Sequence, residues 1–161
     1  GLKNEQIEVV VHPQSIIHSL VQFTDSSIKA QLGLPDMKLP IQYALGFPRR
    51  VQNDFKRFDF RDYSKFTFEQ PDLKTFRNLA LAMEAMEKGG NVPCVMNAAN
   101  EVVVQSFLNN RVSFIEMSDI IENVMGKVAF VGNATLDDYR LSDKEARAVA
   151  SELVKHSQLS H

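Results

Sequence analysis

The β-forming part of this chain reads Val9-Val10-Val11-His12-Pro13-Gln14-Ser15-Ile16-Ile17-His18-Ser19-Leu20-Val21-Gln22-Phe23 and, after a short break, Ile28-Lys29-Ala30-Gln31-Leu32-Gly33. The β-branched residues from Ile7 to Val11 predict a strand that is buried on both faces. Residues 18–23 and 28–32 predict a hairpin, because the turn-forming residues 24–27 separate them at hairpin length. The front of the chain is therefore expected to be a β segment.

Prolines and an irregular segment separate this β segment from the rest of the chain. Pro40 and Pro48 flank a short expected helix over residues 41–45. Residues 49–71 mix basic with aromatic side chains, a pattern that can bind single-stranded nucleic acid by stacking. Acidic residues in the same segment cancel the positive charge that such binding needs. We therefore interpret the aromatic residues as anchors of an extended linker over residues 55–71.

The spacing of apolar residues becomes helical after Pro71. Apolar residues recur three and four positions apart, as in an amphipathic helix. Capping and stop residues then divide the segment into four expected helices: Asp72 to Gly89-Gly90, Pro93 to Leu108, one from the capping box Ser113–Glu116 and one from the capping box Ser142–Glu145. Amphipathic helices with modest connections predict a small bundle.

The expected fold class is α+β. A partial β-sheet or hairpin segment with a short helix occupies residues 1–54, an extended linker residues 55–71, and a C-terminal four-helix bundle residues 72–161. The 161 residues are 44% hydrophobic and 24% charged, as in an ordinary globular protein. The net charge of −2 attracts neither nucleic acid nor an anionic membrane, so neither partner is expected.

Several features that would point to other classes of protein are missing from the sequence. The single cysteine, Cys94, rules out an internal disulfide and fits a reducing compartment, so a cytoplasmic location is expected. No apolar run is long enough to span a membrane. The glycine-rich phosphate loops are also absent, and no carboxylate cluster is poised for a divalent cation. Cofactor-phosphate and metal chemistry are therefore not expected from these residues.

Two histidines lie close together around the end of the first apolar run, with a serine between them. His12 and His18 can each act as a ligand, a general base or a phosphate contact, or can hydrogen-bond a backbone carbonyl and fix the turn at Pro13. Neither His-x-x-x-His nor Cys-x-x-Cys occurs, so no metal ligand is expected. Ser15 lacks the glycines of a nucleophile elbow, and we expect it to donate to a substrate oxygen instead.

A second polar group lies on one face of the expected second helix. Asn97, Asn100 and Glu101 occupy positions i, i+3 and i+4, which share a helix face. The face can simply be solvated, but asparagine is a mediocre helix former. We interpret the cluster as a docking surface for the linker or the other domain.

The chain resembles the C-terminal part of the 1-deoxy-D-xylulose 5-phosphate reductoisomerase family in four separated blocks, in order. These are Val11-His12-Pro13-Gln14-Ser15-Ile16-Ile17-His18-Ser19, Ala30-Gln31-Leu32-Gly33-Leu34-Pro35-Asp36-Met37, Pro40-Ile41 and Asn97-Ala98-Ala99-Asn100-Glu101. One departure is Asp25-Ser26 in the hairpin turn, where the family usually has Asp-Gly; it affects the turn and not the chemistry.

This resemblance implies an NADPH-dependent reductoisomerase that converts 1-deoxy-D-xylulose 5-phosphate to 2-C-methyl-D-erythritol 4-phosphate with Mg²⁺ or Mn²⁺, in the non-mevalonate route to isoprenoids. Residues 1–54 would be the last portion of its catalytic α/β domain. The family's cofactor loop, metal carboxylates and most phosphate ligands lie upstream of this segment. The 161 residues alone are therefore expected to hold neither cofactor nor metal and to show no turnover.

The resemblance also implies roles for individual residues. His18 would orient the substrate or handle a proton, and Ser15 would reach the phosphate side of the pocket. Pro35 and Met37 would border the nicotinamide and exclude water. His12 is interpreted as structural.

A different class of function stays open from the sequence: a non-catalytic helical module for interaction or oligomerisation. The chain starts at Gly1 without an initiator methionine, which favours a segment of a longer protein. Self-association is expected in either case, because the reductoisomerase family is homodimeric and unpaired strand edges favour association.

Overall fold

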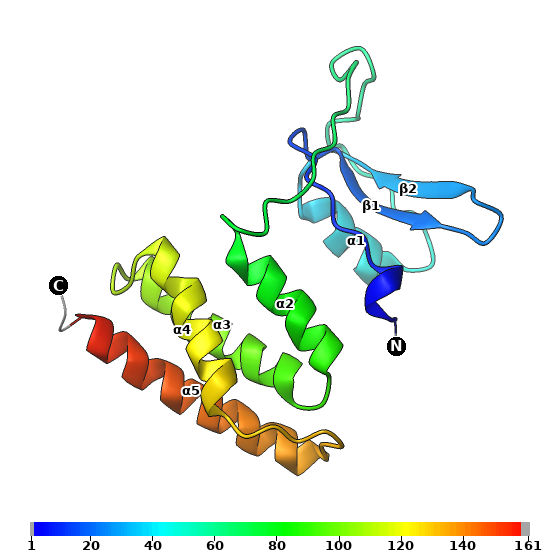
Figure 1. Ribbon diagram of the computed structural model, residues 1–161. Helices are drawn as coiled ribbons and strands as arrows, with labels where there is room; N and C mark the ends of the chain where they lie inside the picture. Colours follow the sequence, from blue (N-terminus) through cyan, green and yellow to red (C-terminus); the bar gives the residue numbers. More distant parts are fainter. Residues whose placement is uncertain (1, 159–161) are drawn as a thin grey trace. The chain divides into compact units, whose positions relative to one another are not determined.

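The computed structural model describes residues 2–158 and has an α+β fold, as expected. Its elements, in chain order, are the 3₁₀-helix η1 (Asn4–Gln6), the strands β1 (Ile17–Gln22) and β2 (Ile28–Leu32), and the helices α1 (Lys38–Gly46), α2 (Arg77–Lys88), α3 (Val92–Leu108), α4 (Phe114–Lys127) and α5 (Leu136–Gln158) (Figure 1). They form two compact units. The hairpin unit is Val9–Pro71, and the helical unit contains the described residues before Val9 and after Pro71.

The hairpin unit is built on the expected antiparallel pair of β1 and β2. Its turn is tightened by Asp25, whose carboxylate accepts hydrogen bonds from the Ser27 backbone N–H at 2.9 Å and from the Ser27 hydroxyl at 2.6 Å. These bonds lower the pKa of Asp25. Ser26 has a left-handed φ of 67°, the conformation that favours glycine. A serine therefore occupies a backbone position at which a glycine would be unstrained.

The expected strand from Ile7 to Val11 is wrong. Only Val11 pairs, through two backbone bonds of 2.9 Å with Glu69, and the residues before it have no strand alongside them in the described chain. β-branched residues fit a sheet, but a strand also needs a partner to satisfy its backbone groups. Here Glu69 supplies the partner, and it comes from the expected linker.

Residues 55–71 belong to the hairpin unit. Their aromatic side chains pack on one another: the Phe58 ring stacks on Tyr63 at 5.4 Å and meets Phe60 edge-on at 4.8 Å. The division of the chain into a catalytic portion, a linker and a bundle remains a proposal. The short helix α1 begins at Lys38, ahead of its expected start at residue 41, because the Asp36 carboxylate accepts the Lys38 N–H at 2.9 Å.

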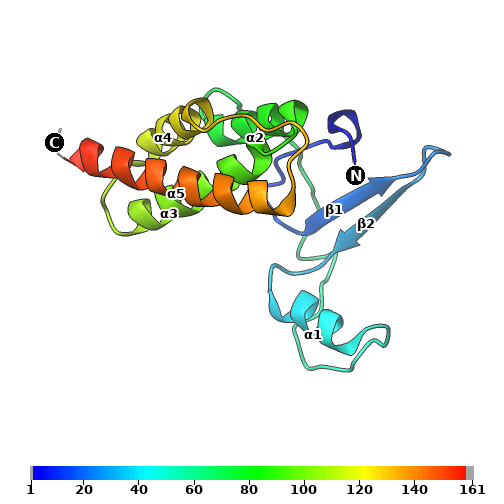
Figure 2. The same cartoon turned by 90° about the horizontal axis from the view of Figure 1, so that it is seen from below.

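The core of the helical unit lies around α3, which contacts α2, α4 and α5 (Figure 2). The buried side chains of α3 are small or β-branched, so neighbouring helices can approach closely. The buried residues of α3 include Val95, Ala98, Ala99 and Val103, and they pack with Ile121 and Val124 of α4 and Ala146, Ala150 and Val154 of α5. Within residues 2–158, no helix is both long and apolar enough to cross a membrane.

One of the expected helix starts agrees with the structure, and two need correction. α4 has the expected capping box, in which Ser113 and Glu116 exchange hydrogen bonds of 2.7 and 3.4 Å. α5 does not start at Ser142 but at Leu136, because Thr135 and Asp138 form a reciprocal cap there: the Thr135 N–H donates to Asp138 at 2.8 Å, and the Asp138 N–H donates to the Thr135 hydroxyl at 3.3 Å. Asp72 caps a turn ahead of α2, where its carboxylate accepts the Thr75 N–H at 3.1 Å.

A buried asparagine ties the α4–α5 connection to the start of α3. Asn91 is 1% exposed, and its amide donates to the Ala129 carbonyl at 2.8 Å and to the Ser142 hydroxyl at 2.9 Å. Its oxygen accepts the Val131 N–H at 2.9 Å. Next to it, Gly90 lies so near this connection that a Cβ there would be 2.4 Å from the Val131 carbonyl oxygen. The apparent capping serine, Ser142, is thus an internal hydrogen-bond partner.

The polar face of α3 packs within its own bundle. Glu101 accepts hydrogen bonds from Asn97 at 3.1 Å and from Arg147 of α5 at 2.7 Å, and these bonds lower its pKa. Arg147 also pairs with Asp143 at 2.9 Å. Within the described chain the partner of Glu101 is a neighbouring helix, and the docking of this face onto a linker or another domain stays a prediction.

Candidate functional site

The candidate site starts with a tight turn in the hairpin unit. The Ser15 N–H donates to the His12 carbonyl at 3.0 Å, which closes the turn around Pro13 and Gln14. Ser15 is exposed and has a left-handed φ of 52°, which non-glycine residues rarely adopt. The next residue, Ile16, is fully buried. The strained, exposed Ser15 is therefore followed directly by Ile16, whose buried side chain fixes the chain at this point.

His18 lies at an irregularity in β1. Ile17 pairs with Leu32 and Ser19 with Gln31, so His18 is an extra residue opposite a regular pair. A bulge of this kind changes the direction of a side chain and is common beside functional sites. His18 is exposed. The sheet therefore presents an imidazole at the position where its regular pairing is interrupted.

Gly33 connects these residues to the loop that contains Pro35 and Met37. Its N–H donates to the Ile16 carbonyl at 3.0 Å, and it is buried. A Cβ at this position would be 3.9 Å from Nε2 of His18 and 3.3 Å from a methyl group of Leu39. The absence of a side chain at Gly33 thus leaves room for Leu39 at the start of α1, and the imidazole of His18 lies within contact distance of the same position.

The loop itself exposes apolar surface. Pro35 is exposed and Met37 is 70% exposed, although methionine is usually buried. Asp36, between them, is committed to the N-terminus of α1 and to an ion pair with Lys38. The loop can therefore offer an apolar wall to a flat ligand.

His12 has a structural environment. Its Nδ1 lies 2.9 Å from the Thr67 carbonyl oxygen, and because a carbonyl only accepts, Nδ1 carries the proton. The ring stacks on Phe68 at 5.0 Å and meets Phe66 edge-on at 5.8 Å. Nε2 is buried and has no hydrogen-bond partner among residues 2–158. The bond to a backbone carbonyl is the one expected of a histidine that fixes a turn.

The sequence did not indicate the pairing of two polar residues at this turn, Gln14 and Thr67. Gln14 donates from Nε2 to the Thr67 hydroxyl at 2.8 Å and accepts the Thr67 N–H on Oε1 at 3.1 Å. Gln14 belongs to the quoted motif, but its partner lies 53 residues away in the expected linker. No spacing in the sequence could have indicated that pair.

The described residues do not fit a metal site. Residues 2–158 contain no group of three His, Cys, Asp or Glu side chains placed to hold a metal ion together. For NADPH, the apolar loop around Met37 suits a wall beside a ring, but the unit has no glycine-rich phosphate loop. We therefore derive no catalytic step through a metal in this chain.

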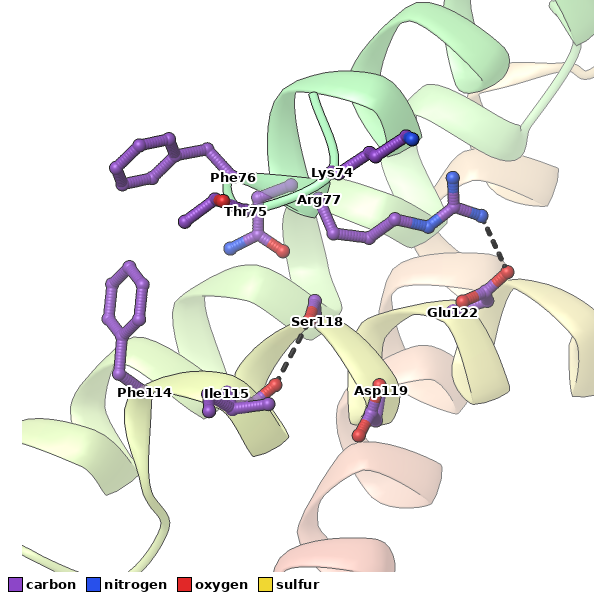
Figure 3. A pocket seen from close by; sticks show the side chains of 10 residues that line it. Lys74, Thr75, Phe76, Arg77, Phe114, Ile115, Ser118, Asp119 and Glu122 are labelled. Carbon is purple, nitrogen blue, oxygen red and sulfur yellow. Dashed lines mark hydrogen bonds and ion pairs between the residues drawn. The ribbon is translucent and has the colours of Figure 1, made fainter. Parts of the chain in front are cut away.

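The helical unit contains a separate cavity of about 300 Å³ between the start of α2 and α4 (Figure 3). Three of its polar side chains make hydrogen bonds within the lining: Arg77 pairs with Glu122 at 2.8 Å, and Ser118 donates to the Ile115 carbonyl at 3.0 Å. The hydrogen bond and charge of Glu122, with a smaller contribution from Glu84, raise the pKa of Arg77 and keep it charged. The cavity is therefore a gap in the packing of the start of α2 against α4.

Comparison with known proteins decides the family. Residues 32–149 match the family model described as DXP reductoisomerase C-terminal domain. This chain belongs to that family. It is 60% identical over 154 residues to the 1-deoxy-D-xylulose 5-phosphate reductoisomerase of Bacteroides fragilis, and 48% identical over 153 residues to that of Porphyromonas gingivalis. These matches cover 96% and 95% of the chain and 40% of each relative.

Solved structures agree with the sequence matches. The reductoisomerase from Zymomonas mobilis in complex with NADPH is 41% identical, with a TM-score of 0.80 over 91% of this chain and 39% of that one. A reductoisomerase in complex with NADPH, fosmidomycin and magnesium is 34% identical, with a TM-score of 0.85 over 96% of this chain and 40% of that one. The chain thus spans about 40% of the length of its curated relatives, and the expected family is confirmed.

Proposed function

We propose that this chain acts as the C-terminal segment of an NADPH-dependent reductoisomerase that converts 1-deoxy-D-xylulose 5-phosphate to 2-C-methyl-D-erythritol 4-phosphate in the non-mevalonate pathway. The 60% identity over 154 residues to a relative of that name carries the proposal. The exposed imidazole of His18, set beside the apolar loop at Gly33, supports it because it gives the segment a chemical role. A purely helical interaction module would leave that arrangement without a purpose.

Each site residue has a proposed task. His18 orients a substrate oxygen or holds a proton there, and Ser15 donates its hydroxyl to the phosphate side of the substrate. Pro35 and Met37 exclude water from the reacting carbon. When bound, NADPH would supply the hydride, and the ligands of Mg²⁺ or Mn²⁺ would come from residues outside this chain.

A hybrid enzyme tests this proposal. In it, the chain replaces the matching C-terminal segment of the Bacteroides fragilis relative, with which it shares 60% identity. We expect the hybrid to oxidise NADPH in the presence of 1-deoxy-D-xylulose 5-phosphate, which is followed by the loss of the ultraviolet absorbance of the reduced cofactor. The 161 residues alone are expected to show no turnover. A folded hybrid that does not turn over would contradict the proposal.

We also infer that the protein is a homodimer and works in the cytoplasm. β1 and β2 form a two-stranded sheet in the described chain, and apolar side chains such as Val21 and Ile28 are 55% and 60% exposed on it. Such edges and surfaces favour association. The lone Cys94 fits a reducing compartment.

Light scattering across a concentration series checks the dimer. The chain is expected to show twice its monomer mass, and Val21→Lys is expected to lower the apparent mass toward the monomer by placing charge on the apolar surface. Leu108→Lys, an exposed position in the helical unit, serves as the control and is expected to leave the mass unchanged. A strict monomer at every concentration would count against the dimer.

A further inference from the structure

All three polar atoms of Thr67 form hydrogen bonds with residues of the turn before β1. Its hydroxyl accepts from Nε2 of Gln14 at 2.8 Å, and its N–H donates to Oε1 of the same side chain at 3.1 Å. Its carbonyl accepts from Nδ1 of His12 at 2.9 Å. One residue of a distant segment therefore holds two of the residues that form the turn.

The surrounding contacts make this attachment rigid. The Val11–Glu69 bridge lies on one side of it, with two backbone bonds of 2.9 Å. The His12 ring stacks on Phe68 at 5.0 Å. Residues 66–69 thus form a strap along the turn, held by backbone pairing, stacking and side-chain hydrogen bonds together.

The residue that needs this support is Ser15. Its φ of 52° is unfavourable for a residue with a Cβ, and such a conformation persists only when the surroundings impose it. The turn bond from the Ser15 N–H to the His12 carbonyl imposes it from one side. The Gln14 side chain, immediately before Ser15, is fixed by Thr67.

We propose that Thr67 is a positioning residue, which acts through Gln14 and His12 to hold the Ser15 hydroxyl where it meets the phosphate side of the substrate. The proposal rests on the function proposed above for Ser15. Thr67 itself contacts no substrate in this scheme. It sets the direction of a hydroxyl, and a misdirected hydroxyl binds an oxygen poorly because hydrogen bonds weaken steeply with angle.

The substitution Thr67→Val separates positioning from folding. Valine keeps the shape of threonine and both backbone bonds of residue 67, and it removes only the hydroxyl that Gln14 uses. In the hybrid enzyme we expect the KM for 1-deoxy-D-xylulose 5-phosphate to rise by roughly tenfold, with kcat within about twofold and the KM for NADPH unchanged. Thr67→Ser retains the hydroxyl and is expected to restore the KM.

A double-mutant cycle tests whether Thr67 acts through Gln14. Gln14→Met removes both side-chain bonds, so adding Thr67→Val to it should raise the KM no further. Thr24→Val changes an exposed threonine in the hairpin turn of the same unit and serves as the matched control. Its KM is expected to equal that of the unmodified hybrid.

Ser15→Ala distinguishes failure of this inference from failure of the proposed function. If Ser15→Ala raises the KM and Thr67→Val does not, Thr67 is not a positioning residue and the role of Ser15 stands. If Thr67→Val lowers the melting temperature and kcat with an unchanged KM, its role is only structural and the inference is overturned. If Ser15→Ala leaves the KM unchanged, both the role of Ser15 and that of Thr67 are refuted, while turnover by the hybrid still supports the reaction.

Discussion

Replacing His18 with alanine in the hybrid enzyme is expected to lower kcat by about 10²- to 10⁴-fold, the usual range for losing a group that handles a proton in the transition state. The bulge at His18 turns its imidazole out of the regular pairing of β1. The side chain is exposed and packs beside Gly33 without supporting a core. The loss should therefore appear in catalysis, with little change in stability.

The measurement is steady-state NADPH oxidation together with a thermal melt. Gln22→Ala, at an exposed position of the same strand, controls for general damage to β1 and is expected to retain the kcat of the hybrid. A His18→Ala hybrid with a kcat within about threefold of the parent would remove His18 from the proposed chemistry. A fall in melting temperature equal in both variants would point to the strand and not to the imidazole.

The second large effect concerns stability. Asn91→Ala is expected to destabilise the helical unit by about 3 kcal/mol, because a buried polar group left without its partner costs about 1–3 kcal/mol. The change orphans the Ala129 carbonyl and the Val131 N–H, and it removes the partner of Ser142. Asn91 is 1% exposed, so water cannot easily replace the lost amide.

Urea unfolding followed by far-ultraviolet circular dichroism measures this effect. The midpoint is expected to fall with an unchanged slope, since the surface exposed on unfolding is the same. Asn123→Ala, at an exposed position of α4, is the matched control and should change the stability by no more than about 0.5 kcal/mol. Equal midpoints for the two variants would show that the buried network contributes little.

Local sequence signals were sufficient where the deciding contacts are local. The Ser113–Glu116 box marks the start of α4 because both partners lie within one turn. The hairpin was predicted for the same reason, since its turn closes between neighbouring residues. The similar box at Ser142 misled, because its serine points into a network with Asn91 that is formed only when α3 and α5 pack.

The candidate site likewise combines features that local sequence indicates with features that depend on packing. The residue types of the motif, and their resemblance to the reductoisomerase family, were sufficient to select His18, Ser15, Pro35 and Met37 as candidates. The bulge at His18 depends on the register between two strands, which the residue pattern of one strand does not specify. Asn97 and Glu101 likewise suggested an interface, but only packing reveals that Arg147 is the partner.

By itself, the sequence determined the α+β class, the positions of the hairpin and of most helices, and the family, because each rests on propensities, caps and motifs that neighbouring residues carry. Only the tertiary structure decided that Val11 pairs with Glu69 and that Thr67 forms hydrogen bonds with Gln14 and His12. Those contacts join residues more than 50 positions apart. Their free energy appears only after the chain has folded back on itself, so no local pattern records it.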